Sequence, residues 1–150
     1  MADRQIVMVG FLQAQNCSNY PASWRHSESA GDFMSPAYYA RIARALEDGK
    51  FHLGFFDDRL AMPDIYGADH AESVRNGVRV VKMDPVPILA TMAMGTKCLG
   101  LAATCSTTYY GPFHIARTFM TRDHMTGGRA GWNVVTSLND SEAFNMGAAG

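Results

Sequence analysis

The sequence predicts an α/β fold built from parallel βα units. Short apolar segments suited to buried strands alternate with segments of helical periodicity, and polar residues gather directly after the apolar segments. This alternation implies a parallel sheet and leaves two architectures open, a doubly wound open sheet and a (β/α)8 barrel. No GxGxxG follows the first strand segment and no GxxxxGK[ST] occurs. The usual nucleotide-binding open sheets are therefore disfavoured.

The first half of the chain contains two predicted strands and one predicted helix. Residues 5–12 (QIVMVGFL) are almost continuously apolar, as in a strand buried on both faces, and the polar residues 13–33 predict a long loop. Ser35 is a helix cap and Pro36 suits the first helical position, so a helix is expected from here to Gly49. Residues 51–56 (FHLGFF) form the second predicted strand, and 57–84 a second long loop.

The second half repeats the same alternation. Asp84 and Pro85 begin a predicted helix that runs to about Lys97. The remaining predicted elements are a strand at 98–105 (CLGLAATC), a helix at 112–125, a strand at 130–136 (AGWNVVT) and the start of a fourth helix at 141–146. Gly127 and Gly128 end the third helix. The order is therefore four βα units.

Composition and charge exclude several classes of protein. The 150 residues are 47% hydrophobic and 18% charged, which is enough apolar material for one domain with a core and excludes a disordered chain. A net charge of -1 gives no reason to expect a nucleic acid or an anionic membrane as partner. No apolar run approaches the roughly 18 residues of a membrane span, and the N-terminus has no signal-peptide pattern. We expect a cytoplasmic protein.

Cysteine and histidine spacing predicts neither a disulfide framework nor a metal site. Cys17, Cys98 and Cys105 form no CxxC pair. We expect Cys98 and Cys105 to be small buried apolar residues. The histidines show no metal-ligand spacing with carboxylates, and no metal is predicted.

Polar residues follow each predicted strand, and in a barrel these positions meet at one mouth. An eight-unit barrel takes roughly 200 residues or more, whereas this chain supplies about four units. We therefore expect residues 1–150 to be the N-terminal half of a barrel in a longer chain, or else an open half-barrel that associates. An unrelated parallel α/β hydrolase is the third alternative, but no GxSxG motif supports it.

Four stretches carry a family resemblance: 51–62 (FHLGFFDDRLAM), 100–114 (GLAATCSTTYYGPFH), 116–131 (ARTFMTRDHMTGGRAG) and 132–147 (WNVVTSLNDSEAFNMG). Together they resemble the bacterial luciferase-like flavin monooxygenase superfamily. Within it they are most similar to the branch that contains nitrilotriacetate, EDTA and dibenzothiophene sulfone monooxygenases. The resemblance covers nearly the whole chain, and its last stretch is the most specific.

The resemblance implies the first half of a (β/α)8 TIM barrel and a two-component enzyme. Such an enzyme binds reduced FMN supplied by a separate NAD(P)H:flavin reductase, and uses O2 to oxygenate a small organic substrate, an aromatic sulfone or similar, with C–S, C–N or C–halogen cleavage. A homo-oligomer is expected. Flavin contacts expected from the second half of the family's barrel are absent from this sequence, so the isolated chain is expected to be inactive. The alternative is a non-catalytic half-barrel that acts by flavin binding or association.

The resemblance assigns the cofactor-binding residues, and alternation along the fourth strand refines them. The matching family positions imply that Asp58 and Thr104 contact the flavin, although Asp58 also suits a turn or helix cap. Asn133 and Ser137 share a face by the period of two, whereas Thr136 reaches the site only at the strand end.

No catalytic residue is assigned, but an apolar substrate pocket is expected. Its candidate lining residues are Phe11, Trp24, His26, Phe56 and Tyr109, for which ordinary core or loop packing is the alternative. Arg59 stands where relatives often carry Gly or Ser. It either pairs with an aspartate or an anionic ligand, or is a solvated loop charge. Arg129 precedes the fourth strand, where structural roles prevail.

Overall fold

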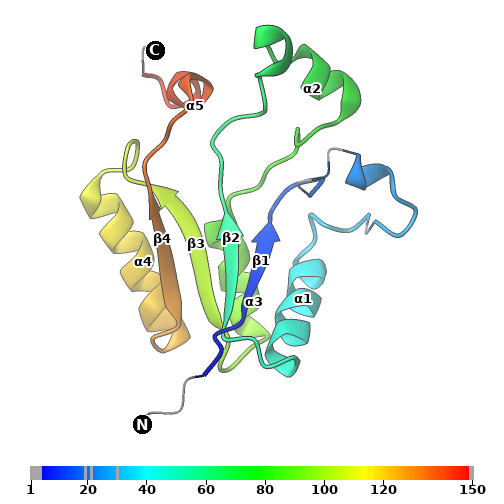
Figure 1. The fold of residues 1–150 in the computed structure, drawn as a ribbon. Coiled ribbons are helices and arrows are strands. Elements are labelled where there is room, and N and C mark those ends of the chain that lie inside the picture. The colour runs from blue at the N-terminus through cyan, green and yellow to red at the C-terminus, as the bar shows by residue number, and fades with distance from the viewer. Residues whose placement is uncertain (1–4, 19, 21, 30, 149–150) are drawn as a thin grey trace.

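The computed structural model describes residues 5–18, 20, 22–29 and 31–148. Four parallel strands form one sheet in the order β1-β2-β3-β4. They are β1 (Val9–Gln13), β2 (Leu53–Asp57), β3 (Gly100–Ser106) and β4 (Ala130–Val135). All four point the same way, so their carboxyl ends meet along one edge of the sheet (Figure 1). The predicted parallel βα architecture is confirmed.

The connecting helices show which parallel architecture this is. They are α1 (Pro36–Asp48), α3 (Pro85–Met94) and α4 (Pro112–Thr126), with the short α2 (Ala71–Asn76) and α5 (Asp140–Asn145) beyond the strand ends. Parallel neighbours in sequential order, joined by right-handed crossovers, place their helices on the same face of the sheet. A doubly wound sheet would reverse its strand order. The winding is that of the first half of a (β/α)8 barrel.

The core lies between β1–β3 and the helices. Phe56 of β2, Leu101 of β3, Leu89 and Met92 of α3, and Tyr39 of α1 are each at most 3% exposed. On β2 the helix-facing positions are Gly54 and Phe56, so Leu53, Phe55 and Asp57 face the opposite side by strand alternation. That opposite side is the barrel-interior face of the sheet.

The predicted helix starts are confirmed. The Ser35 hydroxyl accepts the Tyr38 N–H at 3.2 Å, and the Asp84 carboxylate accepts the Val86 N–H at 2.8 Å. Each cap satisfies an N–H that has no partner within the helix. A proline follows each cap, and α3 also carries Pro87 in its first turn. These caps fix where the chain turns back after the two long loops.

Two predicted segments differ from the structure. The first strand begins at Val9 rather than at residue 5, because its partner β2 begins at Leu53, directly opposite Val9. Residues 5–8 precede this ladder, and Ile6 is 83% exposed. The predicted loop 57–84 contains the helix α2 and a 3-10 turn at Tyr66–Ala68. The Asp69 carboxylate accepts the Ala71 N–H, and Gly77 closes α2 in the left-handed conformation.

The expectation for two cysteines was wrong. Cys98 is exposed and Cys105 is only half-buried, whereas Cys17 is buried. Cys98 precedes β3 in the turn after α3, where its backbone N–H bonds Glu47 rather than a neighbouring strand. All three are free thiols. In the described part of the chain, no helix is long and apolar enough to cross a membrane.

The amino-terminal edge of the sheet is held by two charged side chains. Arg129 donates to the carbonyl of Leu99 at 2.8 Å and to the hydroxyl of Thr96 at 3.0 Å. Glu47 accepts three consecutive backbone N–H groups at residues 97–99, and these bonds hold its pKa below the usual value. The structural role predicted for Arg129 is confirmed.

Candidate functional site

A hollow of about 290 Å³ lies where β2, β3 and β4 end. It is lined by Asp57, Asp58, Arg59, Leu60, Thr104, Ser106, Asn133, Val135, Thr136, Ser137, Leu138, Asn139 and Glu142. All five residues predicted to bind the cofactor, Asp58, Thr104, Asn133, Thr136 and Ser137, are in this set. The structure therefore brings together residues that lie up to 79 positions apart, from 58 to 137, at one end of the sheet.

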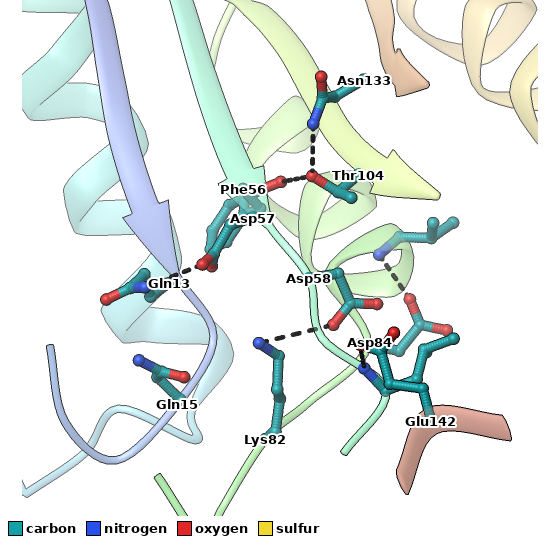
Figure 2. A network of polar contacts seen from close by, with 12 residues as sticks. Gln13, Gln15, Phe56, Asp57, Asp58, Lys82, Asp84, Thr104, Asn133 and Glu142 are labelled. Atoms are coloured by element: carbon teal, nitrogen blue, oxygen red, sulfur yellow. Dashed lines mark hydrogen bonds and ion pairs between the residues drawn. The ribbon is translucent and has the colours of Figure 1, made fainter. Parts of the chain in front are cut away.

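Thr104 and Asn133 form the centre of the hollow. They are neighbours in the β3–β4 register, and the Asn133 amide donates to the Thr104 hydroxyl at 3.0 Å. The Thr104 hydroxyl in turn donates to the carbonyl of Phe56 at 3.0 Å (Figure 2). Thr104 is 6% exposed, so its orientation is fixed by burial and by both bonds. Thr104 consequently orients the Asn133 amide.

Hydroxyl groups line the β3–β4 side. The hydroxyls of Ser106 and Ser137 lie 2.9 Å apart in a hydrogen bond, and the Thr108 hydroxyl accepts the Ser137 N–H at 3.0 Å. Thr136 is exposed just beyond β4, which ends at Val135. In the sequence, Ser106 is counted among the polar residues that follow the third strand but is not assigned to the cofactor, although its period-two spacing from Thr104 places it on the same face.

Gln13 and Asp57 are two further functional candidates: the sequence places Asp57 among the polar residues after the second strand but assigns it no role, and Gln13 was missed. They are the last residues of β1 and β2 and lie opposite each other in the register. The Gln13 amide donates to Asp57 Oδ2 at 2.9 Å, and Figure 2 shows the two side chains facing each other. Asp57 Oδ1 is buried and has no hydrogen-bond partner among the described residues. The signal available from sequence was the position of Asp57 one residue after the buried Phe56.

Asp58 points away from the Asp57 carboxylate and toward the loop before α3. Its carboxylate lies 3.8 Å from the Lys82 ammonium, close to the start of α3 at Asp84 (Figure 2). Burial raises the pKa of Asp58 to about 6, with the Asp84 and Asp57 carboxylates acting in the same direction and Lys82 opposing them. Burial also lowers the pKa of Lys82. For both partners the cost of burial therefore outweighs the attraction across 3.8 Å.

The aromatic residues predicted to line a substrate pocket lie in three different environments. Phe11 is 53% exposed on the barrel-interior face, and its ring centroid lies 5.6 Å from that of Phe55. Phe56 is fully buried among the helices against Tyr39, so it is a core residue at the back of the sheet. The period of two turns Phe56 away from the interior, which favours the core packing that the sequence analysis left open as its alternative. Tyr109 is half-buried and is not among the residues that line the hollow.

Trp24 and His26 also lie away from the hollow. The Trp24 indole N–H donates to the carbonyl of Asn76 at 3.2 Å, and the ring packs against Gly77. His26 accepts the Glu28 N–H through Nδ1. Trp24 therefore joins the loop after β1 to the end of α2. Further bonds between Asn16 and the segment 77–81 reinforce this connection.

The segment after Asp58 is held by α5. Glu142 is 5% exposed, and its carboxylate accepts the Leu60 N–H at 3.1 Å. The Asn145 amide donates to the Leu60 carbonyl at 2.8 Å. Arg59 is exposed between these contacts, lines the hollow, and forms no ion pair in the part of the chain that the structure describes. Within the same residues no group of three metal-ligating side chains occurs.

A comparison with protein families places the chain in a known group. Residues 14–149 match the family model described as luciferase-like monooxygenase. The chain belongs to this family. The match spans every element from the end of β1 to α5, so it includes all the residues that line the hollow.

Curated relatives of this luciferase-like monooxygenase chain are monooxygenases. It is 49% identical over 145 residues to the dibenzothiophene-sulfone monooxygenase of Rhodococcus erythropolis, covering 96% of this chain and 32% of the relative. It is 41% identical to the nitrilotriacetate monooxygenase component A of Aminobacter aminovorans, covering 87% of this chain and 28% of the relative. The chain therefore spans about a third of the length of these relatives.

Solved structures give the same placement. The long-chain alkane monooxygenase LadA superposes with a TM-score of 0.93 at 34% identity, covering 99% of this chain and 34% of LadA. A riboflavin lyase solved with modified FMN and riboflavin superposes with a TM-score of 0.89 at 29% identity, covering 97% and 33% of the two chains. The four βα units therefore correspond to the first part of a larger barrel in these proteins.

Proposed function

We propose that residues 1–150 form the N-terminal half of the oxygenase component of a two-component FMNH2-dependent monooxygenase. The observation that carries the proposal is the hydrogen-bonded hollow of Thr104, Asn133 and Ser137 at the carboxyl ends of the strands. Sites of barrel enzymes lie at this end. The family match and the flavin ligand named for the riboflavin lyase support reduced FMN as its occupant.

The residues present fit a reduced flavin. The flavin ring edge carries hydrogen-bond donors and acceptors, and the hollow offers the Asn133 amide, two serine hydroxyls and the buried free Oδ1 of Asp57. The neighbouring rings of Phe11 and Phe55 supply an apolar surface beside these groups. Asp58 is assigned to the cofactor only through its position at the rim, since its carboxylate faces Lys82. Thr136 is similarly placed at the rim.

The bound cofactor would supply the two electrons with which one atom of O2 enters the substrate and the other becomes water. The residues of this chain would then act by binding and orientation. Thr104 holds the Asn133 amide in one direction, Ser106 holds Ser137, and the neighbouring rings of Phe11 and Phe55 would shield the apolar side of a bound ligand from water.

The partners of this proposed enzyme follow from the same comparisons. A separate NAD(P)H:flavin reductase would deliver the reduced flavin, in keeping with the name "component A" of the nitrilotriacetate relative. The substrate would be a small organic molecule, an aromatic sulfone or similar, given the 49% identity to a dibenzothiophene-sulfone monooxygenase. We further propose a cytoplasmic homo-oligomer with no nucleic acid or membrane partner. A half-barrel that binds flavin without catalysis is the alternative.

Anaerobic titration with reduced FMN tests the proposal, using the protein as it is naturally expressed. Asn133→Ala is expected to weaken binding about tenfold, since a hydrogen bond of this kind is worth ~1 kcal/mol or more. The matched control Asn76→Ala, at the end of α2, is expected to bind like the wild type. Oxygen consumption with a flavin reductase and substrate then distinguishes an oxygenase from a binding half-barrel. Wild-type protein that does not bind reduced FMN would refute both.

A further inference from the structure

The Gln13–Asp57 pair is a polar feature of the barrel-interior face to which the sequence analysis assigned no ligand contact. Both residues end their strands and lie opposite each other in the register. Phe56 faces the helices, which turns Asp57 to the interior side, where it lines the hollow with Thr104 and Asn133. The pair therefore lies on the floor of the candidate site.

Asp57 is held in one orientation with one oxygen left over. Oδ2 accepts the Gln13 amide at 2.9 Å, whereas Oδ1 is buried without a hydrogen-bond partner in the described residues. The Lys82 ammonium attracts the Asp57 carboxylate as well as that of Asp58, but among the described residues the ion pair that it forms, at 3.8 Å, is with Asp58. A buried carboxylate oxygen is costly to leave unpaired, so its retention points to a partner beyond the described residues, such as a ligand in the hollow.

The chemistry of that partner is restricted. A carboxylate oxygen only accepts hydrogen bonds, and a second carboxylate beside Asp57 would be repelled. Around it, three further acidic side chains (Asp58, Asp84 and Glu142) and three basic ones (Arg59, Arg79 and Lys82) lie in or beside the same end of the sheet, so neither sign of charge dominates. At Oδ1 itself the Asp57 carboxylate therefore decides, and it favours a neutral or cationic group in direct contact over an anionic one.

We propose that Asp57, oriented by Gln13, binds an N–H or O–H donor of the ligand in the hollow, and that this contact disfavours a carboxylate or other anionic group at the same position. This inference rests on the proposed function. Where the substrate supplies the donor, it names the substrate class as neutral or cationic aromatics that carry an N–H or O–H group beside the sulfone or similar group. The polycarboxylate named for the nitrilotriacetate relative would be a poor ligand here. The donor comes either from the substrate or from the reduced flavin ring, which share this chemistry.

Equilibrium binding to the naturally expressed protein separates the two sources without relying on turnover. The probes are 4-hydroxybiphenyl, 4-methoxybiphenyl, biphenyl-4-carboxylate and reduced FMN, each titrated anaerobically. The aromatic probes are titrated with reduced FMN present and absent. If the substrate provides the donor, the hydroxyl probe binds at least about tenfold more tightly than the methoxy probe (~1.4 kcal/mol). Asp57→Asn then removes this preference and improves binding of the carboxylate probe.

If the flavin provides the donor, Asp57→Asn instead weakens reduced FMN at least about tenfold and leaves the three aromatic probes in their wild-type order. Asp48→Asn, the same change at the exposed end of α1, is the matched control and leaves every affinity unchanged. Gln13→Met retains the Asp57 carboxylate but no longer holds its orientation. It is expected to weaken the same interaction as Asp57→Asn, either the preference for the hydroxyl probe or the affinity for reduced FMN, by a smaller factor.

The inference is overturned if wild type does not distinguish the hydroxyl from the methoxy probe and Asp57→Asn leaves reduced FMN affinity unchanged. It is also overturned if the carboxylate probe binds wild type as tightly as the hydroxyl probe. If Asp57→Asn does not fold, as judged by circular dichroism, the inference is still tested by the order of probe affinities for wild type and by the Gln13→Met titrations. Wild type that fails to bind reduced FMN refutes the proposed function, whereas the aromatic probes alone continue to test the donor preference.

Discussion

Replacing Phe56 and its neighbour Phe55 by alanine separates a core role from a ligand-binding role. Phe56 is 0% exposed and packs 5.9 Å from the Tyr39 ring, between the sheet and the helices. Deleting a fully buried Phe side chain costs about 3–5 kcal/mol, as lost burial plus the cavity that remains. For a chain of this size that corresponds to a fall in the thermal midpoint of roughly 6–20 °C.

Phe55 provides the matched control, because the same atoms are removed from the other face of the same strand. It is half-buried, and its principal ring contact is Phe11 on the barrel interior. Phe55→Ala is expected to cost only about 1–1.5 kcal/mol. Its main effect would be weaker binding of an aromatic ligand.

Urea unfolding followed by circular dichroism measures both stabilities, and titration with 4-hydroxybiphenyl measures the binding. The expected pattern is crossed: Phe56→Ala loses stability, and Phe55→Ala loses affinity. The reasoning is refuted by two results together. Phe56→Ala would change the unfolding free energy by less than about 1 kcal/mol, and it would lose more affinity for the ligand than Phe55→Ala does. Phe56 would then be a ligand-binding residue, contrary to its position in the core.

Three further changes probe the ends of the sheet. The raised pKa of Asp58, about 6 against 3.8, means that the folded state binds its proton more tightly, so stability falls as pH rises from about 4 to 6. Asp58→Asn is expected to remove this pH dependence, which amounts to up to ~3 kcal/mol of unfolding free energy. Urea unfolding at several pH values measures it, and an unchanged pH dependence would contradict the reasoning. Arg129→Met should destabilise by ~2 kcal/mol by leaving carbonyls unpaired, whereas the exposed Arg117→Met should be near neutral. Glu142→Ala should release Leu60 and speed proteolysis of the segment after β2, and equal cleavage rates would count against that contact.

The parts of the fold that depend on local rules could be predicted from the sequence. Ser35 and Asp84 cap helices whose starts need only a side-chain acceptor and a following proline. The alternation of apolar strands and helices gave the parallel class. The choice between a doubly wound sheet and a barrel, however, depends on strand order, which no local pattern encodes. It required either the resemblance or the observed order β1-β2-β3-β4.

Pairing partners explain the errors at the first strand and at Cys98. Residues 5–8 have the apolar composition of a strand, but β2 begins opposite Val9 and offers no earlier ladder. Cys98 lies in an apolar segment, yet its backbone N–H is bonded to Glu47 in a turn, which leaves the thiol exposed. A strand is a property of two segments, and the sequence of one segment predicts only that it suits the role.

The candidate site shows the same limit at the scale of a single residue. Asp57 and Asp58 are adjacent, and composition does not distinguish them, but alternation along β2 sends their side chains in opposite directions. Phe56 determines which residues face which side, because it is buried against α1 and α3. Asp57 therefore faces the barrel interior, and Asp58 faces Lys82. The resemblance drew attention to Asp58, and the geometry adds Asp57 with its free buried oxygen. One strand end therefore supplies two carboxylates with separate tasks: Asp58 joins the loop before α3 to the sheet, while Asp57 is left to meet the ligand.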